Sequence, residues 1–264
     1  MTAQRFAAGL EYDGSAFFGW QTQSHARSVQ QVLNAAIGMV ANQTVSTAAA
    51  GRTDAGVHAC GQVIHFDTAA RRSLRSWLLG VNSNLPRDAA LQWVREVPGD
   101  FHARYSATAR TYRYAILNRE VRSALDRDRA WCLRGELQEG RMAVAAAHLL
   151  GEHDFSAFRG AGCQARSPVR RLERLVVSRT ADYLHIEVRA NGFLYHMVRN
   201  IVGALVRVGS GEAEPGWLAE LLAGRDRRRG APTAPAQGLY FAEVHYPAGL
   251  ELPSPAPRPV WRDR

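Results

Sequence analysis

The chain has 264 residues, of which 46% are hydrophobic and 22% charged, so a disordered acidic chain and a fibrous repeat are both excluded. Its 33 basic residues outnumber the 24 acidic ones, which gives a formal charge of +9 and predicts a polyanionic partner. Every basic residue is arginine, a side chain that holds phosphates bidentately and stacks on bases. Codon bias in a GC-rich genome is the simpler reason for the missing lysine.

The chain shows no signal for export or membrane insertion. Glu11 and Asp13 interrupt its start before an apolar stretch of signal-peptide length, and no run approaches the roughly 18 apolar residues of a membrane span. Cys60, Cys132 and Cys163 are far apart and lack CxxC spacing, so neither a disulfide framework nor a zinc site is indicated. A cytoplasmic protein with reduced thiols and no bound metal is expected.

Strand and helix patterns alternate through the first half of the chain. The expected elements are a strand at 5–12, a turn at 13–15, a helix at 29–40, strands at 44–50 and 62–66, a helix at 74–81 and a strand at 91–97. Ser28 is placed as the N-cap of the first helix, and the segment NSNLPRD ends the second helix because Pro86 cannot continue it.

The second half repeats this alternation. The expected elements are strands at 110–117, 172–179, 183–189 and 239–246, helices at 138–150, 193–208 and 217–222, and irregular chain at 224–237. This order predicts an α+β fold of two halves, with a boundary between Val97 and Arg110. We expect an N-terminal domain at 1–105, a C-terminal domain at 106–247 and a flexible Pro-rich tail at 248–264.

The densest motif is GRTDAGVHA, Gly51 to Ala59. Its glycines bracket Arg52, Thr53 and Asp54, and a tight glycine turn can present a carboxylate outward on a rigid edge. The neighbouring arginine favours the charged form of Asp54, and an ionised aspartate can act as a nucleophile. A second interpretation stays open, in which Asp54 only caps backbone amides of the turn.

A second motif, NGFLYHMVRN, places Arg199 in an otherwise apolar helix. Arg199 lies on the flank of the apolar stripe, where its long side chain could reach a buried acid such as Asp54. The alternative is a surface arginine whose stem covers apolar neighbours. His58 and His196 have no companion ligands at metal-binding spacing and are interpreted as hydrogen-bonding histidines.

The segment RTYRY, Arg110 to Tyr114, interleaves arginine and tyrosine on an expected strand. Stacking on an unpaired base requires such residues, but packing of a half-buried strand gives the same pattern more simply. Two glycine-containing segments, 12–21 and 234–240, carry no chemistry that their residues alone reveal.

Taken together, the segments resemble the TruA family of tRNA pseudouridine synthases. The resemblance rests on six motifs in order, which are YDGSAFFGWQ, GRTDAGVHA, FHARYSATARTYRY, GEHDFSAFR, NGFLYHMVRN and APAQGLYF. They cover roughly Leu10 to Tyr246. The family converts uridines of the tRNA anticodon stem-loop, usually at positions 38, 39 and 40, into pseudouridine. It implies two pseudo-symmetric halves, each a mostly antiparallel sheet with helices on one face, and an active-site cleft between them.

The resemblance also assigns roles to five residues. Asp54 would be the catalytic aspartate, Arg52 would assist base flipping, and Arg199 would keep Asp54 charged and placed. Tyr112 would stack on the target base and could accept the proton from C5, and Leu239 would pack against that base. Attack at C1′, attack at C6 and a glycal route all stay open.

The same resemblance implies the partners and cofactors. The expected substrate is tRNA, bound by a homodimer, and no metal, nucleotide or other cofactor is implied. One carboxylate suffices because the reaction exchanges an N-glycosidic for a C-glycosidic bond without consuming water.

Two rival functions fit less well. A tRNA-binding or RNA-folding module would not need Asp54, whose charge repels phosphates. A nucleoside hydrolase would need a second carboxylate near Asp54, and the sequence places none there.

Overall fold

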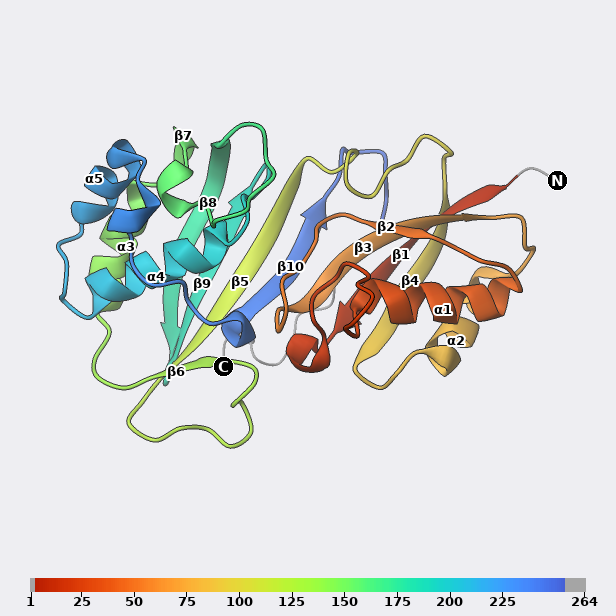
Figure 1. Ribbon diagram of the computed structural model, residues 1–264, viewed down its shortest axis with the longest axis horizontal. Helices are drawn as coiled ribbons and strands as arrows, with labels where there is room; N and C mark the ends of the chain where they lie inside the picture. Colours follow the sequence, from red (N-terminus) through yellow and green to blue (C-terminus); the bar gives the residue numbers. More distant parts are fainter. Residues whose placement is uncertain (1–2, 255–264) are drawn as a thin grey trace. The chain divides into compact units, whose positions relative to one another are not determined.

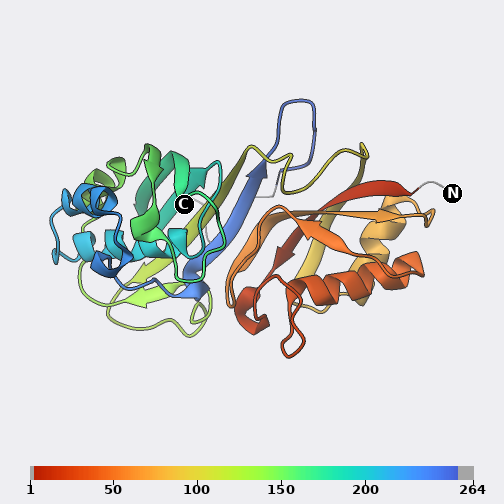
Figure 2. The ribbon, with the colours of Figure 1, turned by 45° about the horizontal axis from the view of Figure 1, so that its top comes forward.

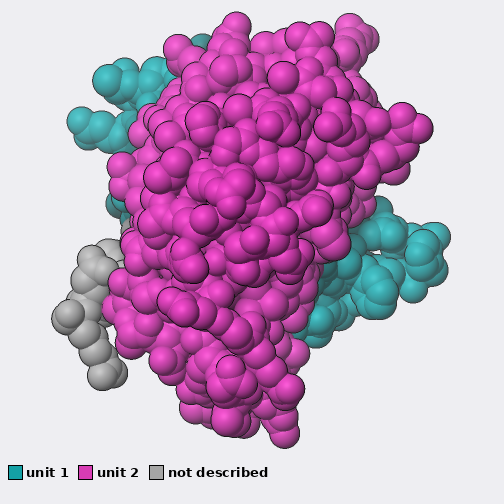
Figure 3. Space-filling view, turned by 90° about the vertical axis from the view of Figure 1, so that its left-hand side faces the viewer, with its two compact units in different colours: residues 1–108, 240–262 teal, residues 109–239, 263–264 magenta. Residues whose placement is uncertain are grey.

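The computed structural model describes residues 3–254, which form two compact units. The first unit comprises residues 3–108 and 240–254, and the second comprises residues 109–239 (Figure 3). Within the described part of the chain, no helix is both long and apolar enough to cross a bilayer.

The first unit is a sheet with two helices on one of its faces (Figures 1 and 2). Its elements are β1 (Gln4–Tyr12), η1 (Gly14–Ala16), α1 (Val29–Ala41), β2 (Thr47–Ala49), β3 (His58–Thr68), α2 (Leu74–Asn84), β4 (Ala89–Val97) and, from the far end of the chain, β10 (Leu239–His245), whose first residue groups with the second unit. Strand β1 lies between β4 and β3 and is antiparallel to both. The other edge of β3 pairs with β2 in antiparallel fashion and with β10 in parallel.

The second unit has the same kind of architecture. Its elements are β5 (Ala109–Asn118), β6 (Trp131–Leu133), α3 (Glu139–Ala147), β7 (Gly151–Asp154), η2 (Ser156–Phe158), β8 (Val169–Thr180), β9 (Tyr183–Ala190), α4 (Met197–Gly209), α5 (Trp217–Gly224), η3 (Arg227–Arg229) and η4 (Ala236–Gly238). Strands β5, β9, β8 and β7 follow one another in an antiparallel sheet, and β6 runs parallel to β5.

The two units repeat one order of elements. The first begins β1-α1-β2-β3-α2, and the second follows β5-α3-β8-β9-α4 when the additional elements β6, β7 and η2 are left out. In each unit the second strand of this pair, β3 after β2 and β9 after β8, pairs with the unit's first strand, β3 with β1 and β9 with β5. The expectation of an α+β fold in two similar halves, each a mostly antiparallel sheet with helices on one face, is confirmed.

Helix α1 and the core beneath the helices follow the sequence pattern closely. The Ser28 hydroxyl accepts the Gln31 N–H, as expected for an N-cap, and α1 ends where Asn42 turns left-handed at φ 52°. Trp77 of α2 is fully buried against Phe6 of β1, with ring centroids 5.7 Å apart. Burial of such aromatic side chains fixes the helix on the sheet.

Several elements differ from the sequence expectation. Helix α4 begins at Met197 and not at residue 193, because His196 adopts a left-handed backbone at φ 59° that an α-helix cannot contain. Strands β6 and β7 were not expected, and the strand expected at 44–50 is confined to β2. The expected irregular segment at 224–237 contains η3 and the start of η4.

The expected domain division stays a prediction. Residues 240–254 group with the first unit, and residues 255–264 of the expected Pro-rich tail lie outside the described part of the chain.

Candidate active site

The motif that carries Asp54 forms a loop between β2 and β3 of the first unit. Arg52 is exposed, Thr53 is buried and Asp54 is half-buried, so the loop turns Thr53 inward and presents its two neighbours outward. Gln62, fully buried in β3, donates to the Gly51 carbonyl at 2.7 Å. The loop is therefore held from the sheet at its beginning.

A second segment, residues 13–20, supports the loop from the other side. The Trp20 N–H donates to the Thr53 carbonyl at 3.0 Å, and the Gly56 N–H donates to the Phe17 carbonyl at 3.2 Å. Gly19 lies against the loop at φ 89°, where an added Cβ would come within 2.7 Å of the Thr53 oxygen. The glycine-containing segment at 12–21, uninformative as sequence, is the backbone support of Asp54.

Buried polar side chains join the same two segments. The Tyr12 hydroxyl lies 2.8 Å from the Thr53 hydroxyl, and burial raises the pKa of Tyr12 to about 12, so the phenol is neutral and can donate. The Gly14 N–H donates to His58 Nδ1 at 3.0 Å. This ring nitrogen therefore acts as an acceptor, and the Asp13 Oδ1 atom lies 3.3 Å from it.

In the second unit, Tyr112 and Tyr114 lie on the same face of β5. Tyr114 is fully buried, its hydroxyl donates to the Pro235 carbonyl at 2.7 Å, and burial raises its pKa well above the usual value. Tyr112 is half-buried and meets the Phe193 ring edge-on at 5.0 Å. Strand packing thus explains Tyr114, while Tyr112 keeps part of its ring accessible.

Arg199 lies in the first turn of α4 and is half-buried. Its Nε donates to the Ala234 carbonyl at 2.7 Å, and the Ala234 N–H donates back to the Arg199 carbonyl at 3.1 Å. The side chain is thus anchored to protein through Nε, which a surface arginine that merely covers apolar neighbours does not require.

Leu239 lies five residues after Ala234, the residue to which Arg199 is bonded. It is the first residue of β10 and is 5% exposed. The preceding Gly238 lies flat on the Tyr114 ring, where an added Cβ would be 2.5 Å from Cε1. Only a residue without a side chain permits this approach, so Gly238 sets the place at which Leu239 enters the strand.

The structure thus places the predicted residues in two groups. Arg52 and Asp54 share one loop of the first unit, and Tyr112, Arg199 and Leu239 belong to the second unit. The catalytic and binding roles of these five residues stay predictions.

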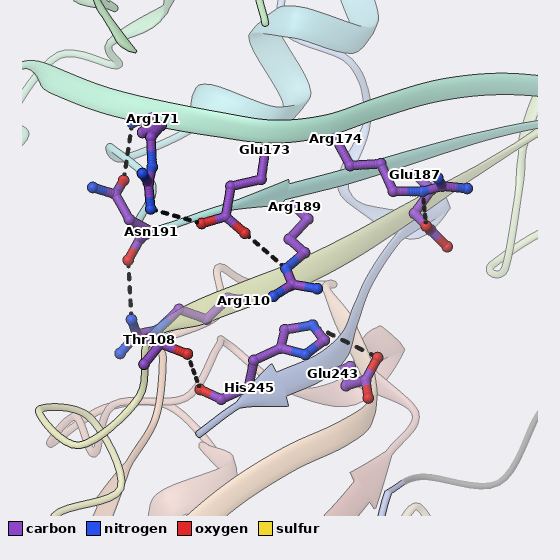
Figure 4. Close-up of polar contacts among 10 residues, drawn as sticks. All are labelled: Thr108, Arg110, Arg171, Glu173, Arg174, Glu187, Arg189, Asn191, Glu243 and His245. Atoms are coloured by element: carbon purple, nitrogen blue, oxygen red, sulfur yellow. Dashed lines mark hydrogen bonds and ion pairs between the residues drawn. The ribbon is translucent and has the colours of Figure 1, made fainter. Parts of the chain in front are cut away.

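The second unit also carries a row of paired charges on β5, β9 and β8 (Figure 4). Glu187 accepts from Arg113 at 2.8 Å and from Arg174 at 2.7 Å, and Glu173 contacts Arg189 at 2.9 Å. Burial acts to raise the pKa of Glu187, but the hydrogen bonds from both arginines outweigh it and hold the pKa below the usual value. These side chains point away from the buried face of β9.

Arginines outnumber carboxylates in this row, and Arg171 adds a further partner for Glu173. The row contributes to the positive charge that the composition predicts, and its cross-strand pairs support the register of the sheet.

Comparison with known proteins identifies a family model and several similar relatives. The family model of tRNA pseudouridine synthases matches residues 8–106 and 145–247. A protein from Vibrio parahaemolyticus named tRNA pseudouridine synthase A is 50% identical over 249 residues, which are 94% of this chain and 94% of the relative. Proteins of the same name from Coxiella burnetii and Aeromonas salmonicida are 51% and 52% identical, covering 94% and 97% of this chain and 95% and 96% of the relatives.

These matches place the chain among the pseudouridine synthases, which are isomerases. Within them, the chain belongs to the tRNA pseudouridine synthase family, as the order of its motifs indicates.

Proposed function

We propose that this protein isomerises uridine to pseudouridine at positions 38, 39 and 40 of the tRNA anticodon stem-loop, with Asp54 as the nucleophile. The observation that carries the proposal is the Asp54 loop, which is held rigidly by Gln62 and by residues 13–20 within a chain that belongs to the family. A rigid carboxylate needs no reorganisation when it meets the nucleoside.

The reaction balances without a further reactant. The bond between C1′ and N1 breaks, a bond between C1′ and C5 forms, the proton on C5 is lost and N1 gains one. A carboxylate that bonds transiently to the nucleoside divides this exchange into two easier steps. Since no water is consumed and no electrons are exchanged, the proposal requires no cofactor or metal.

The other site residues are assigned complementary roles. Tyr112, with a partly accessible ring, stacks on the target base and takes the proton from C5, and Leu239 packs against the base. Arg52, exposed next to Asp54, takes the place of the flipped uridine in the stem. Arg199, anchored at Nε, keeps Asp54 charged and oriented.

The remaining assignments concern the setting of the enzyme. We propose that a homodimer in the cytoplasm binds one tRNA through arginine contacts to phosphates. The net charge of +9 favours such binding.

The experiment that tests the function uses an unmodified tRNA transcript with uridines at the three positions. The purified protein is incubated with it without metal or nucleotide, and pseudouridine is mapped with carbodiimide. Product at positions 38 to 40 supports the proposal. Tight binding without product contradicts it and favours an RNA-binding module in which Asp54 only shapes the turn.

A further inference from the structure

Asn200, the residue after Arg199, is the centre of a buried hydrogen-bond network that the proposed reaction does not use. It is 2% exposed, and its side-chain amide bonds to three separate segments of the second unit. Its Nδ2 donates to the Phe158 carbonyl at 2.8 Å. Its Oδ1 accepts from the Thr233 hydroxyl at 2.7 Å and from Arg227 Nη2 at 3.0 Å.

The network closes on itself. Arg227 Nη2 also donates to the Thr233 hydroxyl at 3.2 Å, so Asn200, Thr233 and Arg227 form a ring of mutual hydrogen bonds. The amide can donate to Phe158 and accept from the other two at once, whereas an ionised carboxylate lacks the donor. The ring therefore fixes residue 233 on the first turn of α4.

Thr233 is directly followed by the residue that holds Arg199. The Ala234 carbonyl accepts from Arg199 Nε at 2.7 Å, and the next carbonyl, of Pro235, accepts from the Tyr114 hydroxyl at 2.7 Å. Because Nε is part of the planar guanidinium, the carbonyl that accepts from it constrains the orientation of the whole group. A shift of residue 233 would therefore turn the Arg199 head group.

We infer that Asn200, Thr233 and Arg227 are positioning residues for Arg199, acting through the Ala234 carbonyl. The inference rests on the proposed function, in which Arg199 orients the carboxylate. A substitution of Thr233 tests the orientation of Arg199 separately from its charge, because the arginine at position 199 is retained.

The decisive variant is Thr233→Val, which removes one hydroxyl and keeps the shape of the side chain. Asn200 Oδ1 retains its bond from Arg227, so no buried acceptor is left unpaired and the chain is expected to fold. The single-turnover rate of pseudouridine formation should fall about tenfold, with tRNA affinity within about twofold, as expected for misorientation of a catalytic group. Thr233→Ser should restore the rate.

A matched control is Thr180→Val, a half-buried threonine at the end of β8 in the same unit. It should leave the rate unchanged. A purely structural role of Thr233 would lower the unfolding temperature without changing the rate per folded molecule, and that result would overturn the inference.

A double-mutant cycle tests the route of the effect. Arg199→Lys removes the Nε donor to Ala234, so adding Thr233→Val to it should have no further effect on the rate. An equal loss in both backgrounds would show that Thr233 acts independently of Arg199 and would refute the inference.

The activity of the unsubstituted chain separates the two proposals. If it forms no pseudouridine, the proposed function is refuted, and the inference with it. If it forms pseudouridine and Thr233→Val is equally fast, only the inference is refuted.

Discussion

Replacement of Gly19 by alanine should displace the Asp54 loop. An added Cβ would lie 2.7 Å from the Thr53 oxygen and 3.1 Å from the Asp54 carbonyl carbon, well inside ordinary contact distance. The position also has a φ of 89°, which L residues rarely adopt. Strain of about 1 to 2 kcal/mol and overpacking of about 1 to 3 kcal/mol together predict a loss of about 2 to 5 kcal/mol in the free energy of unfolding.

Gly211→Ala provides the matched control. Gly211 has a φ of 82°, but nothing lies within 4 Å of an added Cβ, so this variant carries the strain without the collision. It should lose about 1 to 2 kcal/mol on urea unfolding and keep its single-turnover rate. Gly19→Ala should in addition slow turnover about tenfold or more, because the carboxylate moves. This account of the loop would be refuted if Gly19→Ala lost no more stability than Gly211→Ala and kept its single-turnover rate.

Three further predictions concern the carboxylate, the RNA and a buried histidine. Asp54→Asn should abolish pseudouridine formation and keep tRNA affinity within a few-fold, and a large loss of affinity in filter binding would instead indicate a structural turn. A plot of the logarithm of tRNA affinity against the logarithm of salt concentration should have a negative slope of about 0.7 to 0.9 for each phosphate contacted. A slope near zero would contradict phosphate binding. Burial and the neighbouring His102 and Arg5 lower the pKa of His65 to about 4 in the folded chain. As the pH falls, His65 is therefore protonated in the unfolded chain before it is protonated in the folded chain. The free energy of unfolding should decrease as the pH drops from about 6.5 to about 4. His65→Asn, which keeps an acceptor for the Ala103 N–H, should flatten that dependence in thermal unfolding, and the same slope in both proteins would exclude His65 as its source.

Much of the fold could be predicted because its strands and helices carry their own periodicity. Leu184, Ile186 and Val188 alternate along β9, and all three are buried as expected. The turn between β8 and β9 falls at the predicted residues, with Thr180 paired to Tyr183. Such patterns depend only on which face of one element is apolar.

The sequence-based predictions are wrong where the structure depends on an unusual backbone conformation or on pairing with a neighbouring strand. His196 has no composition signal for its left-handed φ, so α4 was extended too far toward the N-terminus. Strand β7 reads GEHD, without apolar alternation, and exists because β8 offers its edge to residues 151–154. Local sequence contains neither kind of information.

The candidate site shows the same limit. The glycines of GRTDAGVHA indicate a turn that presents Asp54, and the structure has that loop. Nothing in the sequence connects Asn200 to Thr233 and Phe158, since the three meet only when α4, η2 and the segment before β10 pack together. The only signal in the sequence is an asparagine beside Arg199 in a mostly apolar helix, where an amide that is buried needs hydrogen-bond partners.

The two motifs of the first unit are best understood as one structural element. An added Cβ at Gly14 would collide with the Val57 carbonyl, and one at Gly19 would collide with that of Thr53, so both glycines are required by the backbone of the Asp54 loop. The segment 12–21 is therefore tied to GRTDAGVHA by packing of the two backbones. It follows that transplanting the Asp54 loop alone into another α+β scaffold should not reproduce its geometry, whereas residues 12–21 and 51–58 carried together keep every hydrogen bond that joins them.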